Sequence, residues 1–173
     1  MNMYPHLTNA RSSLADKFYA LQTPARRDSL FAKLTGQSTN LAMFPEQASQ
    51  KSPNRKYIGV NDIPIEQIVG TLNRNSDFDN KFRPLKSYLR DRWVNAYLSL
   101  ENGDWTPIVV HKVGEEYYVE DGHHRVSVAR SLGRTCIEAK IWEHSTQIMQ
   151  AKKRQSEPCK ERSSVKAYAY IDK

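Results

Sequence analysis

The segment from Tyr117 to Gly133 constrains the fold most, because three backbone preferences follow one another in it without a spacer. It reads YYVEDGHHRVSVARSLG, and its first three residues are strand formers. Val126, Ala129 and Leu132 are spaced for one face of a helix, and Gly133 stands where a helix-ending glycine is expected. The sequence therefore predicts a strand, a short acidic turn and a helix in direct succession.

The start of this predicted helix has the properties of an anion site. The first N–H groups of a helix have no partner within it and lie at the positive end of its dipole. We expect Gly122 to let a phosphate approach the backbone without meeting a Cβ, with His123, His124 and Arg125 adding donors. In the alternative interpretation, Asp121 is only the helix cap and the basic side chains are solvated.

The order of strand, DGHHR turn and small-residue helix resembles the ParB/sulfiredoxin-like (ParB N-terminal-like nuclease) domain family. The corresponding turn is Gly-Glu-Arg-Arg in ParB proteins and Gly-Cys-His-Arg in sulfiredoxin, and both hold nucleotide phosphates. A free-serine kinase branch carries a similar Asp-Gly-His-x-Arg. The upstream order agrees, with an Ile63-Pro64 segment, a long helix and the apolar run 107–110. The resemblance implies an α+β fold, a small mixed sheet packed by helices, over residues 57–143.

Carried over residue by residue, the resemblance places Gly122, His124 and Arg125 on the phosphates of a nucleoside triphosphate, ATP or CTP, with or without Mg²⁺. His123 stands where sulfiredoxin has its cysteine, and an imidazole cannot perform that thiol chemistry. Sulfiredoxin activity is therefore not expected. Two residues of the ParB turn are also replaced, which weakens the case for a CTP-operated clamp.

Two functional hypotheses follow. In the first, the chain is a nucleotide-binding, ParB-like module with a regulatory or nucleic-acid-associated role. In the second, it is a small-molecule phosphotransferase resembling the free-serine kinases, with Glu120 or Asp121 as base and His123 and Arg125 stabilising the transferred group. A nuclease is less favoured, because the sequence contains no strong metal constellation. The neighbouring His123 and His124 point about 100° apart on a helix and do not easily share one ion.

The basic excess of the chain, +7 overall, lies outside the presumed domain. Residues 1–56 carry 8 Lys/Arg and 3 Asp/Glu, residues 57–143 carry 11 and 13, and residues 144–173 carry 7 and 3. We therefore divide the chain into a basic helical arm with a linker (1–56), the domain (57–143) and a basic C-terminal extension (144–173). Basic arms can track a nucleic-acid backbone, and a solvated, solubilising tail is the alternative.

The sequence contains no run long enough to span a membrane, and its start lacks the apolar region of a signal peptide. Its two cysteines, Cys136 and Cys159, have no Cys-x-x-Cys spacing. We expect a soluble, cytoplasmic protein without a disulfide framework or zinc site. Within a strand over residues 136–142, Cys136 is expected to be buried.

In the N-terminal arm, the spacing predicts two short helices that pack on the domain. The first covers residues 8–20, and the second begins at Pro24 and ends at Gly36. The predicted apolar stripe of the second helix consists of Leu30, Phe31 and Leu34. Residues 36–56 are interpreted as a linker anchored on the core by Leu41, Met43 and Phe44.

The domain itself is expected to begin with a strand at residues 57–60 and one helical turn ending at Gly70. A long helix runs from Pro84 to Gly103. The loop 73–84 between them contains two carboxylates, two arginines and two phenylalanines. It is either a Mg²⁺ site or an acidic turn with both phenylalanines in the core, and we favour the second interpretation. Beyond residue 144 we expect a polar helix to about Gln155, then an edge strand or a disordered end at 167–171.

Overall fold

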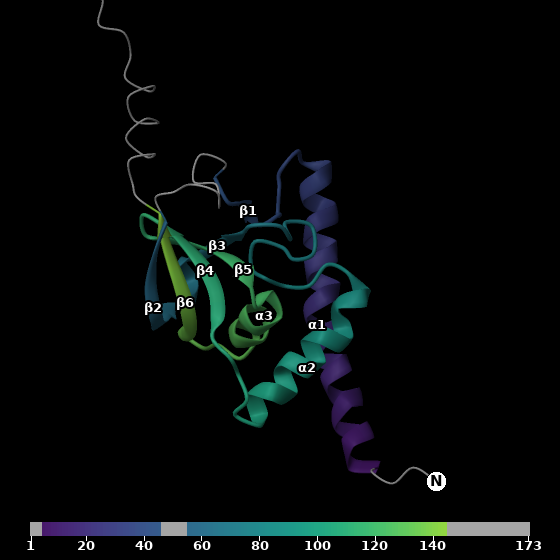
Figure 1. Ribbon diagram of the computed structural model, residues 1–173. Helices are drawn as coiled ribbons and strands as arrows, with labels where there is room; N and C mark the ends of the chain where they lie inside the picture. Colours follow the sequence, from purple (N-terminus) through teal and green to yellow (C-terminus); the bar gives the residue numbers. More distant parts are fainter. Residues whose placement is uncertain (1–4, 46–54, 145–173) are drawn as a thin grey trace, which may run out of the picture.

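The computed structural model describes residues 5–45 and 55–144 of the chain (Figure 1). A mixed sheet of six strands in the order β1-β3-β5-β4-β6-β2 lies beside three α-helices. Helix α3 lies next to the sheet, α2 contacts α3, and α1 contacts the outer side of α2 (Figure 1). The elements are α1 (Pro5–Leu34), β1 (Ala42–Met43), β2 (Arg55–Pro64), η2 (Ile65–Gln67), β3 (Ile68–Thr71), η3 (Ser87–Leu89), α2 (Arg90–Glu101), β4 (Ile108–Val113), β5 (Glu116–Asp121), α3 (His123–Ser131) and β6 (Cys136–His144).

The centre of the sheet is the antiparallel pair β4 and β5, which a tight turn at Gly114 joins. β3 pairs with β5 in parallel, and β6 pairs with β4 in parallel. Helix α3 connects β5 to β6 and covers the sheet with its apolar side, which includes the buried Val126 and Ala129. The prediction of an α+β fold with a small mixed sheet, packed by helices and preceded by a helical arm, is confirmed.

The main core lies between the sheet and the helices. Trp93 of α2 and Phe18 of α1 are fully buried there, with ring centroids 6.0 Å apart. The indole N–H of Trp93 donates to the Ser127 hydroxyl of α3 at 3.1 Å, which satisfies the polar atom of this large side chain. The arm therefore packs on the domain, as predicted.

The arm is one continuous helix of 30 residues, so the prediction of two short helices is wrong. Pro24 lies inside α1, where it costs one backbone hydrogen bond. Buried residues on both sides of it, Phe18 and Ala25 among them, hold the helix against the domain. Long-range packing thus outweighs the local preference of proline to begin a helix.

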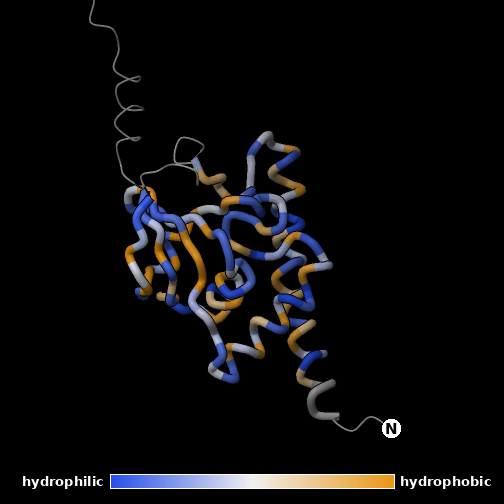
Figure 2. Tube along the Cα trace, viewed as in Figure 1, coloured by the Kyte–Doolittle hydropathy of each residue, from blue (hydrophilic) through white to orange (hydrophobic). Residues whose placement is uncertain are grey.

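The predicted apolar stripe at the end of the arm is also wrong. Leu30, Phe31 and Leu34 are 66%, 68% and 81% exposed, and Figure 2 shows hydrophobic segments at this end of α1. The face of the last turns that meets the domain carries Asp28, whose Oδ2 accepts a hydrogen bond from Arg83 at 2.8 Å. This ion pair and the buried Ala32 set the rotation of the helix, which leaves the larger apolar side chains outside.

β2 is longer than predicted, and the expected helical turn ending at Gly70 is only a single 3-10 turn before strand β3. Gly70 is needed there because a Cβ would lie 2.3 Å from the carbonyl oxygen of Ala42 and 2.6 Å from the ring of Tyr118. α2 begins at Arg90 instead of Pro84, because Pro84 bridges back to Phe78.

Strand β6 confirms the predicted strand, but Cys136 is exposed, so the prediction of a buried thiol is wrong. Burial alternates along β6, and Cys136 begins it on the solvent side. Of the expected linker anchors, Leu41 is buried, whereas Met43 is 50% exposed. The helix and strand predicted beyond residue 144 lie outside the described residues. In the part of the chain that the structure covers, no helix is long and apolar enough to cross a membrane.

Candidate functional site

The predicted strand, turn and helix are β5, Gly122 and α3. The first backbone bond of the helix runs from the Val126 N–H to the Gly122 carbonyl at 3.0 Å. The N–H groups of His123, His124 and Arg125 precede it and have no acceptor within the helix. The N-cap residue of α3 is Gly122, and the carboxylate of Asp121 accepts from the Arg125 guanidinium, so the alternative of Asp121 as the cap is wrong.

Gly122 is required for a reason that differs from the expected one. Its φ angle is 100°, in the left-handed region, and a Cβ at this position would lie 2.4 Å from Cγ2 of Ile108. The missing side chain therefore makes room for a buried residue of β4. The expectation that it makes room for a phosphate has no support in this geometry.

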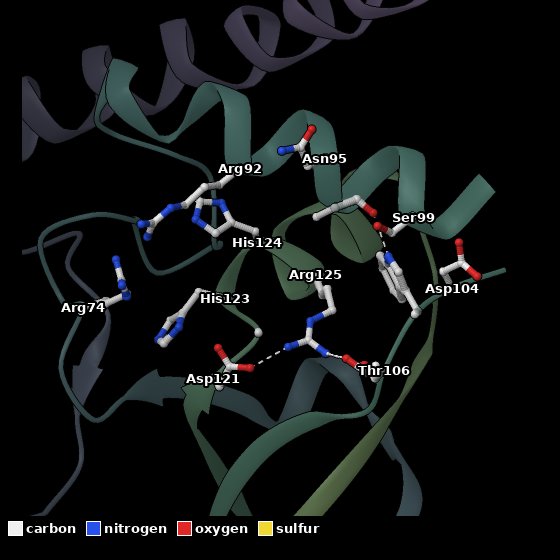
Figure 3. Close-up of a pocket in the computed structure, with 13 residues that line it drawn as sticks. Arg74, Arg92, Asn95, Ser99, Asp104, Thr106, Asp121, His123, His124 and Arg125 are labelled. Carbon is white, nitrogen blue, oxygen red and sulfur yellow. Dashed lines mark hydrogen bonds and ion pairs between the residues drawn. The ribbon is translucent and has the colours of Figure 1, made fainter. Parts of the chain in front are cut away.

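A cavity of about 330 Å³ opens at the start of α3. Besides residues 121–125, three segments line it: Arg74 from the loop after β3, one face of α2, and the segment 104–106 that follows α2. Figure 3 shows Arg74 and Arg92 on the side where His123 and His124 lie. The lining residues are Arg74, Arg92, Asn95, Ala96, Ser99, Asp104, Trp105, Thr106, Asp121, Gly122, His123, His124 and Arg125.

His123 is fixed by a hydrogen bond between its Nε2 and the Thr71 hydroxyl, 2.7 Å apart. The backbone N–H groups of Asn73 and Arg74 already donate to that hydroxyl oxygen at 3.2 and 3.1 Å. These two bonds engage both lone pairs of the hydroxyl, and its one proton has two possible acceptors, the Val119 carbonyl at 3.4 Å and Nε2 of His123 at 2.7 Å. Because the shorter contact is the stronger hydrogen bond, we infer that Thr71 donates to Nε2 and that His123 carries its own proton on Nδ1. Burial, reinforced by the charge of Arg74, lowers the pKa of His123 to about 4.

His124 differs from its neighbour because both of its ring nitrogens are buried without a hydrogen-bond partner among the described residues. Its ring stands edge-on to Phe78 at a centroid distance of 5.4 Å. Burial, followed by the charges of Arg74 and Arg92, lowers the pKa of His124 to about 4. At neutral pH it is therefore an uncharged imidazole, with one donor and one acceptor to offer.

Arg125 reaches the cavity wall, but its guanidinium is largely engaged by the protein. Nη1 donates to the carbonyl and hydroxyl oxygens of Thr106 and, at 3.1 Å, to the carbonyl of Pro107. Nη2 donates to Asp121 Oδ2 at 2.7 Å. Arg125 thus links α3 to the segment before β4. The DGHHR motif alone does not show which residues Arg125 binds.

Arg92 was not indicated by the sequence as a site residue, whereas Arg74 belongs to the loop 73–84, which the sequence marks by its two arginines and two carboxylates. Arg74 donates to Asp77 Oδ2 at 3.0 Å, and Tyr88 holds the other oxygen of that carboxylate. Arg92 makes no hydrogen bond or ion pair with any other residue that the structure describes. The available signal was the spacing of Arg92, Asn95 and Ser99, which places three polar residues on one face of α2.

The loop 73–84 forms a wall behind the two histidines. Phe78 and Phe82 are buried, and Phe78 stacks on His123 with centroids 6.0 Å apart. Asp79 is fully buried and accepts hydrogen bonds from Arg83 Nε at 2.7 Å and from two backbone N–H groups. The favoured interpretation, an acidic turn with both phenylalanines in the core, is confirmed. Within residues 5–45 and 55–144, no three His, Cys, Asp or Glu side chains are placed to hold a metal ion.

The expectation that Glu120 faces the phosphate site is wrong. Successive side chains of a strand point to opposite faces, so Glu120 lies on the other side of β5 from Asp121. There its Oε2 lies 2.7 Å from Nε2 of His111, and Glu120 is absent from the cavity wall. Asp121 does line the cavity, with its carboxylate bonded to Arg125.

Known proteins resemble this chain in structure and in sequence. The chain is similar to the crystal structure of sulfiredoxin from Arabidopsis thaliana, at 22% sequence identity and a TM-score of 0.39. That similarity covers 53% of this chain and 93% of the sulfiredoxin chain. No curated protein matches the sequence. Residues 47–154 match the family model of the ParB N-terminal domain, and because this is more than half of the 173 residues, the chain belongs to the ParB N-terminal domain family.

Proposed function

We propose that the cavity at the start of α3 binds the phosphate groups of a nucleoside triphosphate, such as ATP or CTP, in a ParB-like domain that acts in association with nucleic acid. One observation carries the proposal. Arg74 and Arg92, from segments far apart in the chain, point into the same cavity as the free N–H groups of α3 (Figure 3). Two guanidinium groups and a helix N-terminus together favour an anion of more than one charge.

The charge of this part of the cavity supports the proposal. Arg74 shares its charge with Asp77, whereas Arg92 has no acidic partner among the residues described. His123 and His124 are uncharged at neutral pH, so they offer hydrogen bonds without adding repulsion to the empty cavity. A bound phosphate would relieve the mutual repulsion of the arginines.

The other end of the cavity suits the remainder of a nucleotide. It carries an amide, a hydroxyl and a carboxylate from Asn95, Ser99 and Asp104. The indole of Trp105 is fixed beside them, because its N–H donates to the Ala96 carbonyl at 2.7 Å. These groups can bond a ribose or a base edge, so we expect a nucleotide to bind more tightly than inorganic pyrophosphate.

The geometry supports binding better than phosphoryl transfer. Of the three residues suggested for catalysis, Glu120 lies on the opposite face, Asp121 is paired with Arg125, and His123 is bonded to Thr71. Only Asp121 still has an unbonded carboxylate oxygen at the cavity, and its other oxygen is held by Arg125. The basic arms remain our proposal for contact with nucleic acid, and α1 contributes the exposed Arg26, Arg27 and Lys33 to them.

A thermal-shift titration with ATP and CTP tests the proposal. Ligand at about 100 times its Kd should stabilise the wild-type protein by about 2.7 kcal/mol. Arg92→Ala and Arg74→Ala should each lose most of this shift. Arg26→Ala removes an exposed arginine of α1 and is the matched control. The proposal is refuted if neither nucleotide shifts the wild-type protein, or if the two cavity variants respond as the control does.

A further inference from the structure

We propose that the last turns of α1 bind an acidic amphipathic helix of another protein on the side that faces away from the domain. The binding surface, the outer stripe, consists of three exposed apolar residues and three exposed cations beside them: Leu30, Phe31, Leu34, Arg26, Arg27 and Lys33. This inference goes beyond the proposed function, because no residue of α1 lines the cavity at the start of α3.

The packing of α1 on the domain does not explain the apolar side chains of the outer stripe. The contact with the domain runs through Ala25 and Ala32, which are both buried. Leu30 lies two residues before Ala32, about 200° around the helix, so it points away from that contact. α1 is therefore apolar on two opposite sides, and Figure 2 shows hydrophobic segments at this end. Exposed apolar side chains gathered at one place mark an interaction site.

The spacing of the outer stripe fits a second helix. Arg27, Leu30 and Leu34 are separated by three and four residues, so they lie on one line along α1. Apolar side chains at this spacing form a seam into which the side chains of a facing helix pack. A bilayer fits less well, because the charge of Arg27 on the same line would enter its apolar interior. A facing helix can place a carboxylate opposite Arg27.

The charges of the outer stripe determine which kind of helix fits it. α1 contains only two carboxylates. Asp16 lies about 21 Å before Leu30 along the helix axis, and Asp28 is bound to Arg83 at 2.8 Å.

Arg27 lies 3.8 Å from Asp28, whereas Arg26 and Lys33 have no ion-pair partner among the residues that the structure describes. Arg26 and Lys33 are seven residues apart, on one flank of the seam. A helix with Glu or Asp beside its apolar seam would pair with these cations, and a basic helix would be repelled.

The same charges disfavour a second copy of this chain. Antiparallel copies of α1 would bring Arg26 and Lys33 of one chain beside those of the other, and parallel copies would bring the two Arg27 side chains together. Residues 144–173 carry 7 Lys/Arg and 3 Asp/Glu, so they are repelled as well. A nucleic acid would neutralise the cations but leave the apolar side chains in water. It would compete with the acidic helix for Arg26 and Lys33.

Fluorescence anisotropy of a labelled peptide tests the proposal on the full chain. The peptide has about 21 residues in heptads, with Leu at both seam positions and Glu on both flanks, and a matched peptide carries Lys in place of Glu. Wild-type protein should bind the Glu peptide at least about tenfold more tightly than the Lys peptide. The double variant Arg26→Glu, Lys33→Glu should reverse this preference, because it reverses the charge of the flank.

The double variant Leu30→Ser, Leu34→Ser should lower the affinity for the Glu peptide at least about tenfold. Both leucines are exposed, so this variant should fold, which thermal unfolding followed by circular dichroism checks. Leu132→Ser removes a leucine near the end of α3 that is 44% exposed, and this matched control should bind as wild-type protein does. No binding of the Glu peptide by wild-type protein, or equal binding by the double leucine variant, overturns the proposal.

Three measurements on wild-type protein and the double leucine variant identify a different occupant. A dimer in sedimentation equilibrium that only wild-type protein forms would show that a second copy covers the outer stripe. Flotation with vesicles of phosphatidylserine and phosphatidylcholine, lost in the variant, would indicate a bilayer. Duplex DNA binding lost in the variant would indicate a nucleic acid. Each of these results overturns the proposal, whereas the nucleotide titration tests the proposed function separately.

Discussion

The buried carboxylate of Asp79 gives the sharpest stability prediction. Its side chain is 0% exposed, and Oδ1 accepts hydrogen bonds from the backbone N–H groups of Lys81 and Arg83. Oδ2 accepts a hydrogen bond from Nε of Arg83 and forms an ion pair with Nη2 of the same side chain. Asp79→Ala leaves these donors and the charge of Arg83 uncompensated. Removing one partner of a buried ion pair costs about 3–5 kcal/mol. This is a large share of the free energy of unfolding of a typical domain, which is about 5–15 kcal/mol.

The control for this variant is Asp28→Ala. Asp28 binds the same guanidinium at 2.8 Å, but its side chain is 40% exposed, so solvent screens the pair and its removal should cost much less than the removal of Asp79. Urea denaturation followed by circular dichroism measures both values. Equal losses for the two variants, or a loss below about 1 kcal/mol for Asp79→Ala, would contradict the reasoning, because burial would then not decide the strength of the pair.

Asp79→Ala should also affect the cavity, because its loop carries Phe78, which packs on both histidines. We expect nucleotide stabilisation to weaken under conditions in which the variant is still folded. A thermal-shift titration below the unfolding midpoint measures this effect. If nucleotide affinity is unchanged, the loop is a structural wall without influence on the site.

Three further predictions follow from single features of the site. Gly122→Ala should destabilise the domain by about 2 kcal/mol or more in urea, because its φ is positive and its Cβ would meet Ile108 at 2.4 Å; full stability would contradict this. Arg125→Gln should lower stability by about 1–3 kcal/mol but reduce nucleotide binding less than Arg92→Ala, and the reverse order would show that Arg125 grips the ligand. The pKa is lowered from 6.5 to about 4 in His123, His124 and His144. The unfolded chain therefore binds protons first. Each of the three groups contributes about 2.5 kcal/mol between pH 6.5 and 4, so the free energy of unfolding should fall by up to about 7.5 kcal/mol over this range, while a flat denaturation profile would contradict this.

The sequence alone determined the local succession at the centre of the protein. Strand formers, a glycine and a helical apolar spacing predicted β5, the turn and α3, and Gly133 ends that helix region with a φ of 67°. These elements depend on a few neighbouring residues, so they can be predicted without knowledge of the fold. The sequence also allowed the prediction that the side chains of Glu120 and Asp121 point in opposite directions, because this follows from the two-residue period of a strand.

Tertiary structure decided which side chains share the cavity. Arg74 and Arg92 come from a loop and a helix that periodicity describes separately. The pairing of β3 with β5 brings Arg74 to the start of α3, and the packing of α2 on α3 brings Arg92 there. The same holds for Arg125, whose partners at Thr106 and Pro107 precede a different strand. Local spacing shows which residues share a face of an element, whereas the contacts of that face depend on chain segments far away. The motif could therefore be recognised in the sequence, but the charge of the cavity and its free hydrogen-bonding groups could not be predicted from it.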